Sequence, residues 1–190
     1  MIERKNYTIE NYHTEVSVDE YKKECVNVEE FLECCKACRN YDKVWSCPSY
    51  DFSSYDYWDQ FKTLYIYGRK ILFSEELRKK NYSPEEVMHL TETLLETEKR
   101  DMAEELLAME KEYPGSVSLS AGSCLICGNG NCTRPSGKPC RFPEKMRYSL
   151  ESLGGNVGLT ITKYLHLELL WLEQGKLPDY FILVAGLLKQ

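Results

Sequence analysis

The stretch SPEEVMHLTETLLETEKRDMAEELLAMEKEYPG, residues 83–115, carries the strongest structural signal in the chain. Its first four letters combine a serine cap, a proline suited to the first helical position and a glutamate that completes a capping box. Apolar side chains then recur at helical spacing, at Val87, Leu94, Met102, Leu106, Met109 and Tyr113. The Pro-Gly pair at 114–115 ends the pattern. We therefore predict a helix over Pro84–Glu112, about 44 Å long at about 1.5 Å per residue, with one face packed on a sheet.

Strand-like segments lie on both sides of this helix. Leu64–Phe73 (LYIYGRKILF) is rich in β-branched and aromatic residues, and Val117–Ala121 is a short strand after the helix. The strand–helix–strand order predicts a crossover with these two strands parallel, which would bring the residues after the second strand to the carboxyl ends of the sheet. His166–Trp171 alternates and Phe181–Leu188 is apolar on both faces, so we expect a terminal hairpin whose second strand is buried.

Shorter elements account for the remaining segments. The patterns predict a strand over His13–Val18, helices over Val28–Ala37, Ser53–Phe61 and Pro143–Leu153, and a further helical turn or two reaching Lys163. The chain shows no internal repeat and no low-complexity linker. We expect a single metal-binding domain over residues 1–190. Its fold class is α/β in the α+β sense, with a small mixed sheet, one long packed helix and two Cys-rich metal-binding loops.

Composition excludes several classes of protein. Of the 190 residues, 43% are hydrophobic and 28% charged, which is ordinary for a globular domain. The longest apolar run, Phe181–Leu188, is too short to span a bilayer, and the first residues contain no hydrophobic signal core. The net charge of −6 argues against a generally basic nucleic-acid binder. A cytoplasmic protein without membrane contact is therefore expected, and nucleic acid is not expected as a partner.

Nine cysteines are the most informative feature of the composition. Thiols in a cytoplasmic protein stay reduced, so clustered cysteines there favour metal ligands or redox groups. The first cluster is Cys35-x2-Cys38-x8-Cys47, and the second is Cys124-x2-Cys127-x4-Cys132-x7-Cys140. These seven are the candidate metal ligands: Cys35, Cys38, Cys47, Cys124, Cys127, Cys132 and Cys140. Cys25 and Cys34 are interpreted as small apolar residues.

The spacing leaves the metal open between two alternatives. An iron–sulfur cluster uses most of the seven thiols, fits the Pro that follows Cys47, and fits the lack of any His inside either cluster. Zinc could be held by the two Cys-x2-Cys pairs together, which leaves the other three cysteines unused. A dithiol redox centre is the weaker reading, because it explains still fewer of them. We favour an iron–sulfur cluster of the 4Fe–4S type, with zinc as the alternative.

Other polar and aromatic side chains have two interpretations each. Cations around the second cluster could offset the charge of a thiolate site, receive an anionic ligand, or be solvated surface charges: Arg134, Lys138, Arg141, Lys145 and Arg147. Aromatic residues between Tyr41 and Tyr67 could shield a cluster or form core. His13, His89 and His166 are isolated and are interpreted as structural. The sequence contains no phosphate-binding loop, dinucleotide fingerprint or nucleophile elbow.

Two segments of the chain resemble a known prokaryotic family. CKACRNYDKVWSCPSY and AGSCLICGNGNCTRPSGKPCRFPEKMRYSLESLGGNV are similar to a family of uncharacterised predicted metal-binding proteins, a domain of unknown function. The resemblance covers most of the chain and carries over to the same seven cysteines. Ser49 and Tyr148 stand where the family commonly has proline. The resemblance implies metal binding and no particular reaction.

Three functions are compatible with these features. The favoured one is an iron–sulfur electron carrier or redox accessory that works with a partner protein. The second is an interaction module held together by structural zinc, without redox activity. The third is an enzyme, because three cysteines in the first cluster would leave a metal position open; its catalytic residues are unknown. We also expect the two clusters to lie on the same side of the sheet.

Overall fold

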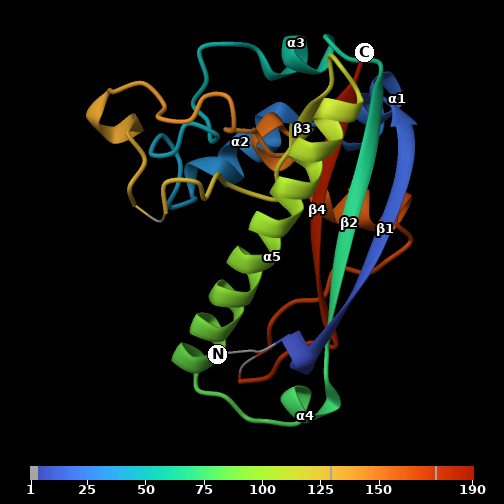
Figure 1. Cartoon of the computed structure of the whole chain (residues 1–190), viewed down its shortest axis with the longest axis vertical. Coiled ribbons are helices and arrows are strands. Elements are labelled where there is room, and N and C mark those ends of the chain that lie inside the picture. The colour runs from blue at the N-terminus through green and yellow to red at the C-terminus, as the bar shows by residue number, and fades with distance from the viewer. Residues whose placement is uncertain (1–3, 129, 174) are drawn as a thin grey trace.

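The computed structural model describes residues 4–128, 130–173 and 175–190, and its strands form one sheet (Figure 1). The strand order is β1-β2-β4-β3, and every neighbouring pair is antiparallel. The strands span Tyr7–Ser17 (β1), Thr63–Phe73 (β2), Val117–Leu119 (β3) and Tyr180–Lys189 (β4). The α+β class is confirmed, but the predicted mixed sheet is wrong: the pairing is antiparallel throughout these strands.

The position of β4 explains this difference. β2 and β3 run in the same direction, as predicted, but β4 lies between them and pairs with both. Leu188 of β4 is opposite Leu64 in β2 and opposite Val117 in β3, so β3 starts level with the start of β2. The 29 residues of the connecting helix span about 44 Å and the 11 residues of β2 about 36 Å. The helix therefore returns the chain to the amino end of β2, so the predicted position at the carboxyl ends of the strands is wrong.

The long helix α5 spans Pro84–Glu112, with the predicted boundaries. The Glu86 amide donates to Ser83 Oγ over 3.2 Å, and the Ser83 amide donates to the Glu86 carboxylate over 2.8 Å, so the capping box is formed. The predicted face is buried at Val87, Leu94, Met102 and Leu106. Figure 1 shows this helix lying along one face of the sheet. Local signals in the sequence were therefore sufficient to place this element.

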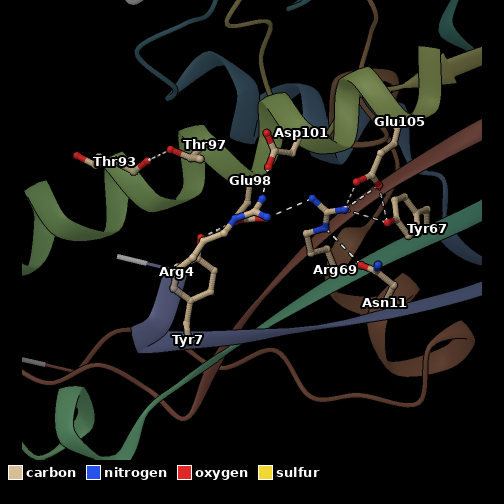
Figure 2. Close-up of polar contacts among 10 residues, drawn as sticks. All are labelled: Arg4, Tyr7, Asn11, Tyr67, Arg69, Thr93, Thr97, Glu98, Asp101 and Glu105. Atoms are coloured by element: carbon tan, nitrogen blue, oxygen red, sulfur yellow. Dashed lines mark hydrogen bonds and ion pairs between the residues drawn. The ribbon is translucent and has the colours of Figure 1, made fainter. Parts of the chain in front are cut away.

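A buried charge network joins α5 to the sheet (Figure 2). Arg69 of β2 pairs with Glu98 over 3.2 Å and with Glu105 over 2.7 Å. The Tyr7 hydroxyl donates to Glu98 over 2.7 Å, and Arg69 Nε donates to the Asn11 side chain over 3.3 Å. Glu98 and Arg69 are almost completely excluded from solvent. Because an unpaired buried charge is strongly destabilising, this network favours one placement of α5 over the sheet.

The shorter helices surround the sheet. They span Val18–Cys25 (α1), Val28–Lys36 (α2), Ser54–Trp58 (α3), Glu75–Arg78 (α4) and Val157–Tyr164 (α6). Short 3-10 turns span Arg4–Asn6 (η1), Arg134–Ser136 (η2) and Glu151–Leu153 (η3). The predicted cap of α2 is present, since the Glu30 amide donates to the Asn27 side chain over 3.1 Å. The first strand starts earlier than the predicted His13–Val18, and Val18 already begins α1.

Two predicted elements are wrong. Within the predicted helix Pro143–Leu153, only the 3-10 turn η3 is helical. Side chains there bond to the backbone instead: the Ser149 amide donates to Ser152 Oγ over 2.9 Å, and the Ser152 amide donates to Ser149 Oγ over 3.2 Å. His166–Trp171 forms no strand, so there is no terminal hairpin. A hairpin partner has no place beside β4, because both of its edges are already paired, one with β2 and the other with β3. The backbone at His166 is also not extended, since its φ is positive, at 54°.

The two faces of the sheet bury separate cores. Leu64 and Ile66 of β2 point into a core that also contains Tyr21, Trp58 and Ile161. Alternate β2 and β4 residues point the opposite way, into the core beneath α5. Within the described residues, no helix is both long and apolar enough to cross a membrane.

Candidate metal centre

The two cysteine clusters lie in mostly irregular segments that meet beside the sheet, with Cys35 in the last turn of α2. We call residues 35–50, which follow most of α2, the first cysteine loop, and residues 122–142, which follow β3, the second cysteine loop. Figure 1 shows them side by side, the first in blue to cyan and the second in yellow to orange. The Cys124 amide donates to Ser46 Oγ over 2.9 Å, and the Asn40 side chain donates to Ser123 Oγ over 3.0 Å. Because the two loops are in direct contact, the prediction that the two clusters lie on the same side of the sheet is confirmed.

Arg134 of the second loop is inserted into the first loop. Its guanidinium lies 5.4 Å from the centroid of the Trp45 ring and pairs with Asp42 over 2.9 Å. It also donates to three backbone carbonyls of the first loop, those of Val44, Cys47 and Ser49. The side chain is only 10% exposed. Arg134 is therefore a bridge between the loops, and the interpretation of it as a solvated surface charge is wrong.

Trp45 makes the reciprocal contact from the first loop. Its indole N–H donates to Thr133 Oγ1 over 3.3 Å and to the Lys138 carbonyl over 3.2 Å. Three other aromatic rings of the segment, Tyr50, Phe52 and Tyr57, pack with Tyr148 against the core, which confirms the packing interpretation for these three. The aromatic segment thus connects the first cysteine loop to the core.

Four cysteines line one small cavity, which we call the four-thiol cavity. They are Cys124, Cys127, Cys132 and Cys140, and the cavity volume is about 30 Å³. Burial raises the pKa of Cys124, and the other three thiols, which are close enough to interact with it electrostatically, raise it further. Gly128 and Gly130 in the same wall have positive φ values of 77° and 74°, a conformation that favours glycine. The glycines let this loop curl back on itself.

Three cysteines line a second, larger cavity, which we call the three-thiol cavity. They are Cys35, Cys38 and Cys47, and the volume is about 170 Å³. Burial raises the pKa of Cys47 to about 11, and the thiols of Cys38 and Cys35 add to the shift. Burial also raises the pKa of Cys35. Without metal these two thiols are protonated at neutral pH, so metal binding would release their protons.

Glu151 supplies a further donor to the three-thiol cavity. Its Oε2 atom is buried and has no hydrogen-bond partner among the described residues. Burial raises the pKa of this carboxyl group. Sequence reasoning missed Glu151 because it placed the residue inside a helix. The one available signal was an acidic residue between Leu150 and Leu153, in a stretch otherwise suited to the core.

The donor chemistry of both cavities fits a thiophilic metal. Within the described residues, no three Cys, His, Asp or Glu side chains converge closely enough to hold an ion without rearrangement. None of the nine cysteines, all of them in described parts of the chain, is in a disulfide, so the thiols that line the cavities are free to bind metal. Sulfur donors, alone or with one carboxylate oxygen, suit zinc and iron–sulfur clusters. The assignment of the seven ligands stays a prediction.

The remaining cysteines and cations lie apart from the two cavities. Cys25 is 3% exposed in the core, whereas Cys34 is exposed and lines neither cavity. Burial confirms the interpretation of Cys25 as a small apolar residue, while exposure contradicts it for Cys34.

Two other side chains considered in the sequence have structural contacts. Arg147 is held by Glu110 in a two-point ion pair, over 2.6 and 2.7 Å. His13 stacks on Tyr65 with ring centroids 5.7 Å apart.

A family model matches most of the chain, over residues 20–188. Its description is predicted metal-binding protein (DUF2284). No curated protein and no solved structure gives a match.

Proposed function

The chain belongs to this family of predicted metal-binding proteins, and we propose that it is an iron–sulfur protein that carries electrons or serves as a redox accessory to a partner protein. The observation that supports this most is the donor set. Seven thiols and no imidazole line two adjoining cavities, and the larger cavity also has a buried carboxyl oxygen, of Glu151, that has no hydrogen-bond partner among the described residues. A cluster held by thiolates would supply one-electron transfer.

The three-thiol cavity is the better candidate for the cluster. Its volume of about 170 Å³ has room for a group of several atoms, while the other cavity has about 30 Å³. Cys35, Cys38 and Cys47 would provide three sulfur ligands, and Glu151, which lines the same cavity, would provide a fourth donor.

Residues around this cavity would hold the ligands in place and limit water. Arg134 binds the Cys47 carbonyl and so ties the third ligand to the second loop. Its positive charge also acts on the Cys47 thiol in the direction that favours thiolate. Pro48 in the cavity wall is buried, and Tyr50 donates to the Ser46 carbonyl over 2.7 Å. These contacts would keep the loop conformation similar in the oxidised and reduced states.

A structural zinc ion is the second candidate, and it suits the four-thiol cavity. A volume of about 30 Å³ corresponds to little more than a single water-sized occupant, and four thiolates around one ion form a closed tetrahedral site. In this arrangement the second loop would be held by zinc while the first loop carries the redox group.

Metal analysis under exclusion of oxygen tests both assignments. The full chain is purified anaerobically from iron-replete cells, and iron, acid-labile sulfide and zinc are measured per chain together with the visible spectrum. We expect a brown protein with iron and sulfide, absorbance that bleaches on reduction, and about one zinc per chain. A colourless protein that contains only zinc would overturn the redox proposal and leave the structural module.

A further inference from the structure

A pocket of about 290 Å³ lies between α5, β3 and the start of the second cysteine loop. It is distinct from both thiol cavities, although Cys124 lies in its wall. Most of its surface is apolar, formed by Leu106 and Leu107 of α5, Leu119 of β3, and Leu125 and Ile126 beyond it. A concave apolar site with a few charged groups is typical of a small-molecule pocket.

Three cations line this pocket without a matching anion. They are Lys99 and Arg100 of α5 and Lys145 after the second loop. In the described parts of the chain, no carboxylate lies within ion-pair distance of any of them, although Lys99 interacts at longer range with Glu151. Arg147, in the same wall, is neutralised by Glu110. The lining contains one acidic residue, Glu104, against these three cations, so the pocket keeps a net positive charge.

We propose that this pocket binds a small organic anion, with an apolar body against the leucines and a carboxylate or phosphate head near Lys99, Arg100 and Lys145. Burial of the body supplies affinity, and the cations select the charge of the head. A simple inorganic anion would leave the apolar wall hydrated, and a neutral molecule would leave the cations without a partner. This binding activity goes beyond electron transfer and needs no metal in either cavity.

The location connects the pocket to the four-thiol cavity. Ser123, Cys124 and Ile126 line both, so a bound anion would lie against the segment that carries Cys124. Occupation of the pocket would restrict the motion of that segment. Because both sites share this segment, binding of the anion in the pocket and binding of metal in the four-thiol cavity can each change the affinity for the other.

Titration calorimetry of the purified full chain tests the proposal with four probes: octanoate, octyl phosphate, 1-octanol and inorganic phosphate. We expect octanoate or octyl phosphate to bind at least tenfold more tightly than both 1-octanol and inorganic phosphate, and the tighter of the two identifies the head group. Binding should weaken as salt is added, because the cations are partly exposed. Absence of binding by both organic anions, or equal binding of 1-octanol, overturns the proposal.

Paired variants separate this pocket from general surface charge. The double variant Arg100→Gln/Lys145→Gln removes two cations at exposed positions and should weaken binding of the preferred anion at least tenfold. The control Lys138→Gln/Arg141→Gln makes the same change in charge at exposed positions outside the pocket and should leave binding within twofold. Equal losses in the two double variants, or no loss in the first, would show that the pocket is not the site.

Discussion

The two cysteine loops each contribute a Cys-x2-Cys pair to a cavity, yet the completed cavities differ in donors and in size. The second loop supplies all four thiols around about 30 Å³ from one continuous segment. The first loop supplies three thiols around about 170 Å³, and the fourth candidate donor, Glu151, comes from over a hundred residues later in the chain. The same local motif can therefore belong to a self-contained site or to one that depends on the fold.

The largest expected effect is the loss of the four-thiol site. Cys127→Ser should abolish zinc binding and destabilise the protein by about 4 kcal/mol, the value for a metal held a thousandfold above its dissociation constant. For a chain of this size that is a decrease in melting temperature of roughly 10 °C. Zinc analysis and thermal unfolding measure the two effects. Cys34→Ser is the matched control, because Cys34 is an exposed thiol in neither cavity; an equal loss there would contradict the assignment.

Removal of Arg134 should affect both cavities at once. Arg134→Met keeps much of the side-chain length but leaves three carbonyls of the first loop without this donor, two of them partly buried, so we expect a destabilisation of about 3 kcal/mol. Retention of both zinc and iron should decrease in this variant. Arg141→Met, at an exposed position of the same loop, should change neither. If Arg134→Met lowers only one metal, the two sites are less dependent on their shared contacts than the structure indicates.

Loss of one thiol from the larger cavity should separate the two metals. Cys47→Ser should remove iron and visible absorbance while zinc content stays within error, because Cys47 lines only the three-thiol cavity. The stability change should be about 2 kcal/mol, smaller than for Cys127→Ser, since the first loop is also attached to the core through Tyr50. Iron and zinc are measured on the same sample. Simultaneous loss of both metals would indicate one shared site.

The smallest expected effect is at the carboxylate. Glu151→Gln keeps the size and removes the charged donor, so we expect about tenfold weaker retention of iron, equivalent to about 1.4 kcal/mol. The electron paramagnetic resonance spectrum of the reduced protein should also change, because one donor differs. Glu144→Gln is the matched control at an exposed site. An unchanged spectrum and iron content would leave Glu151 as a buried carboxyl group without a ligand role.

Local sequence signals succeeded where a single segment contains all the information. The cap, the proline and the apolar spacing of residues 83–115 placed α5 with the observed boundaries. The spacing of the cysteines placed them in two loops, and the lining of each cavity matches the two predicted clusters. In the same way, Asn27 followed by acidic residues located the start of α2. Backbone capping and short cysteine spacing act over a few residues, so they are visible without the fold.

Sequence reasoning failed where distant segments compete for the same partner. β4, at the end of the chain, pairs with both β2 and β3, so the sheet is antiparallel and the terminal hairpin has no free edge to form on. Ser149 and Ser152 satisfy each other's backbone amides, so residues 143–153 remain mostly irregular and Glu151 faces the three-thiol cavity. The sequence by itself determined which cysteines could bind metal, because that depends on thiol chemistry and short spacing. Only the tertiary structure decided which of them share a cavity, because that depends on contacts such as Arg134 with the first loop, made between residues more than eighty positions apart.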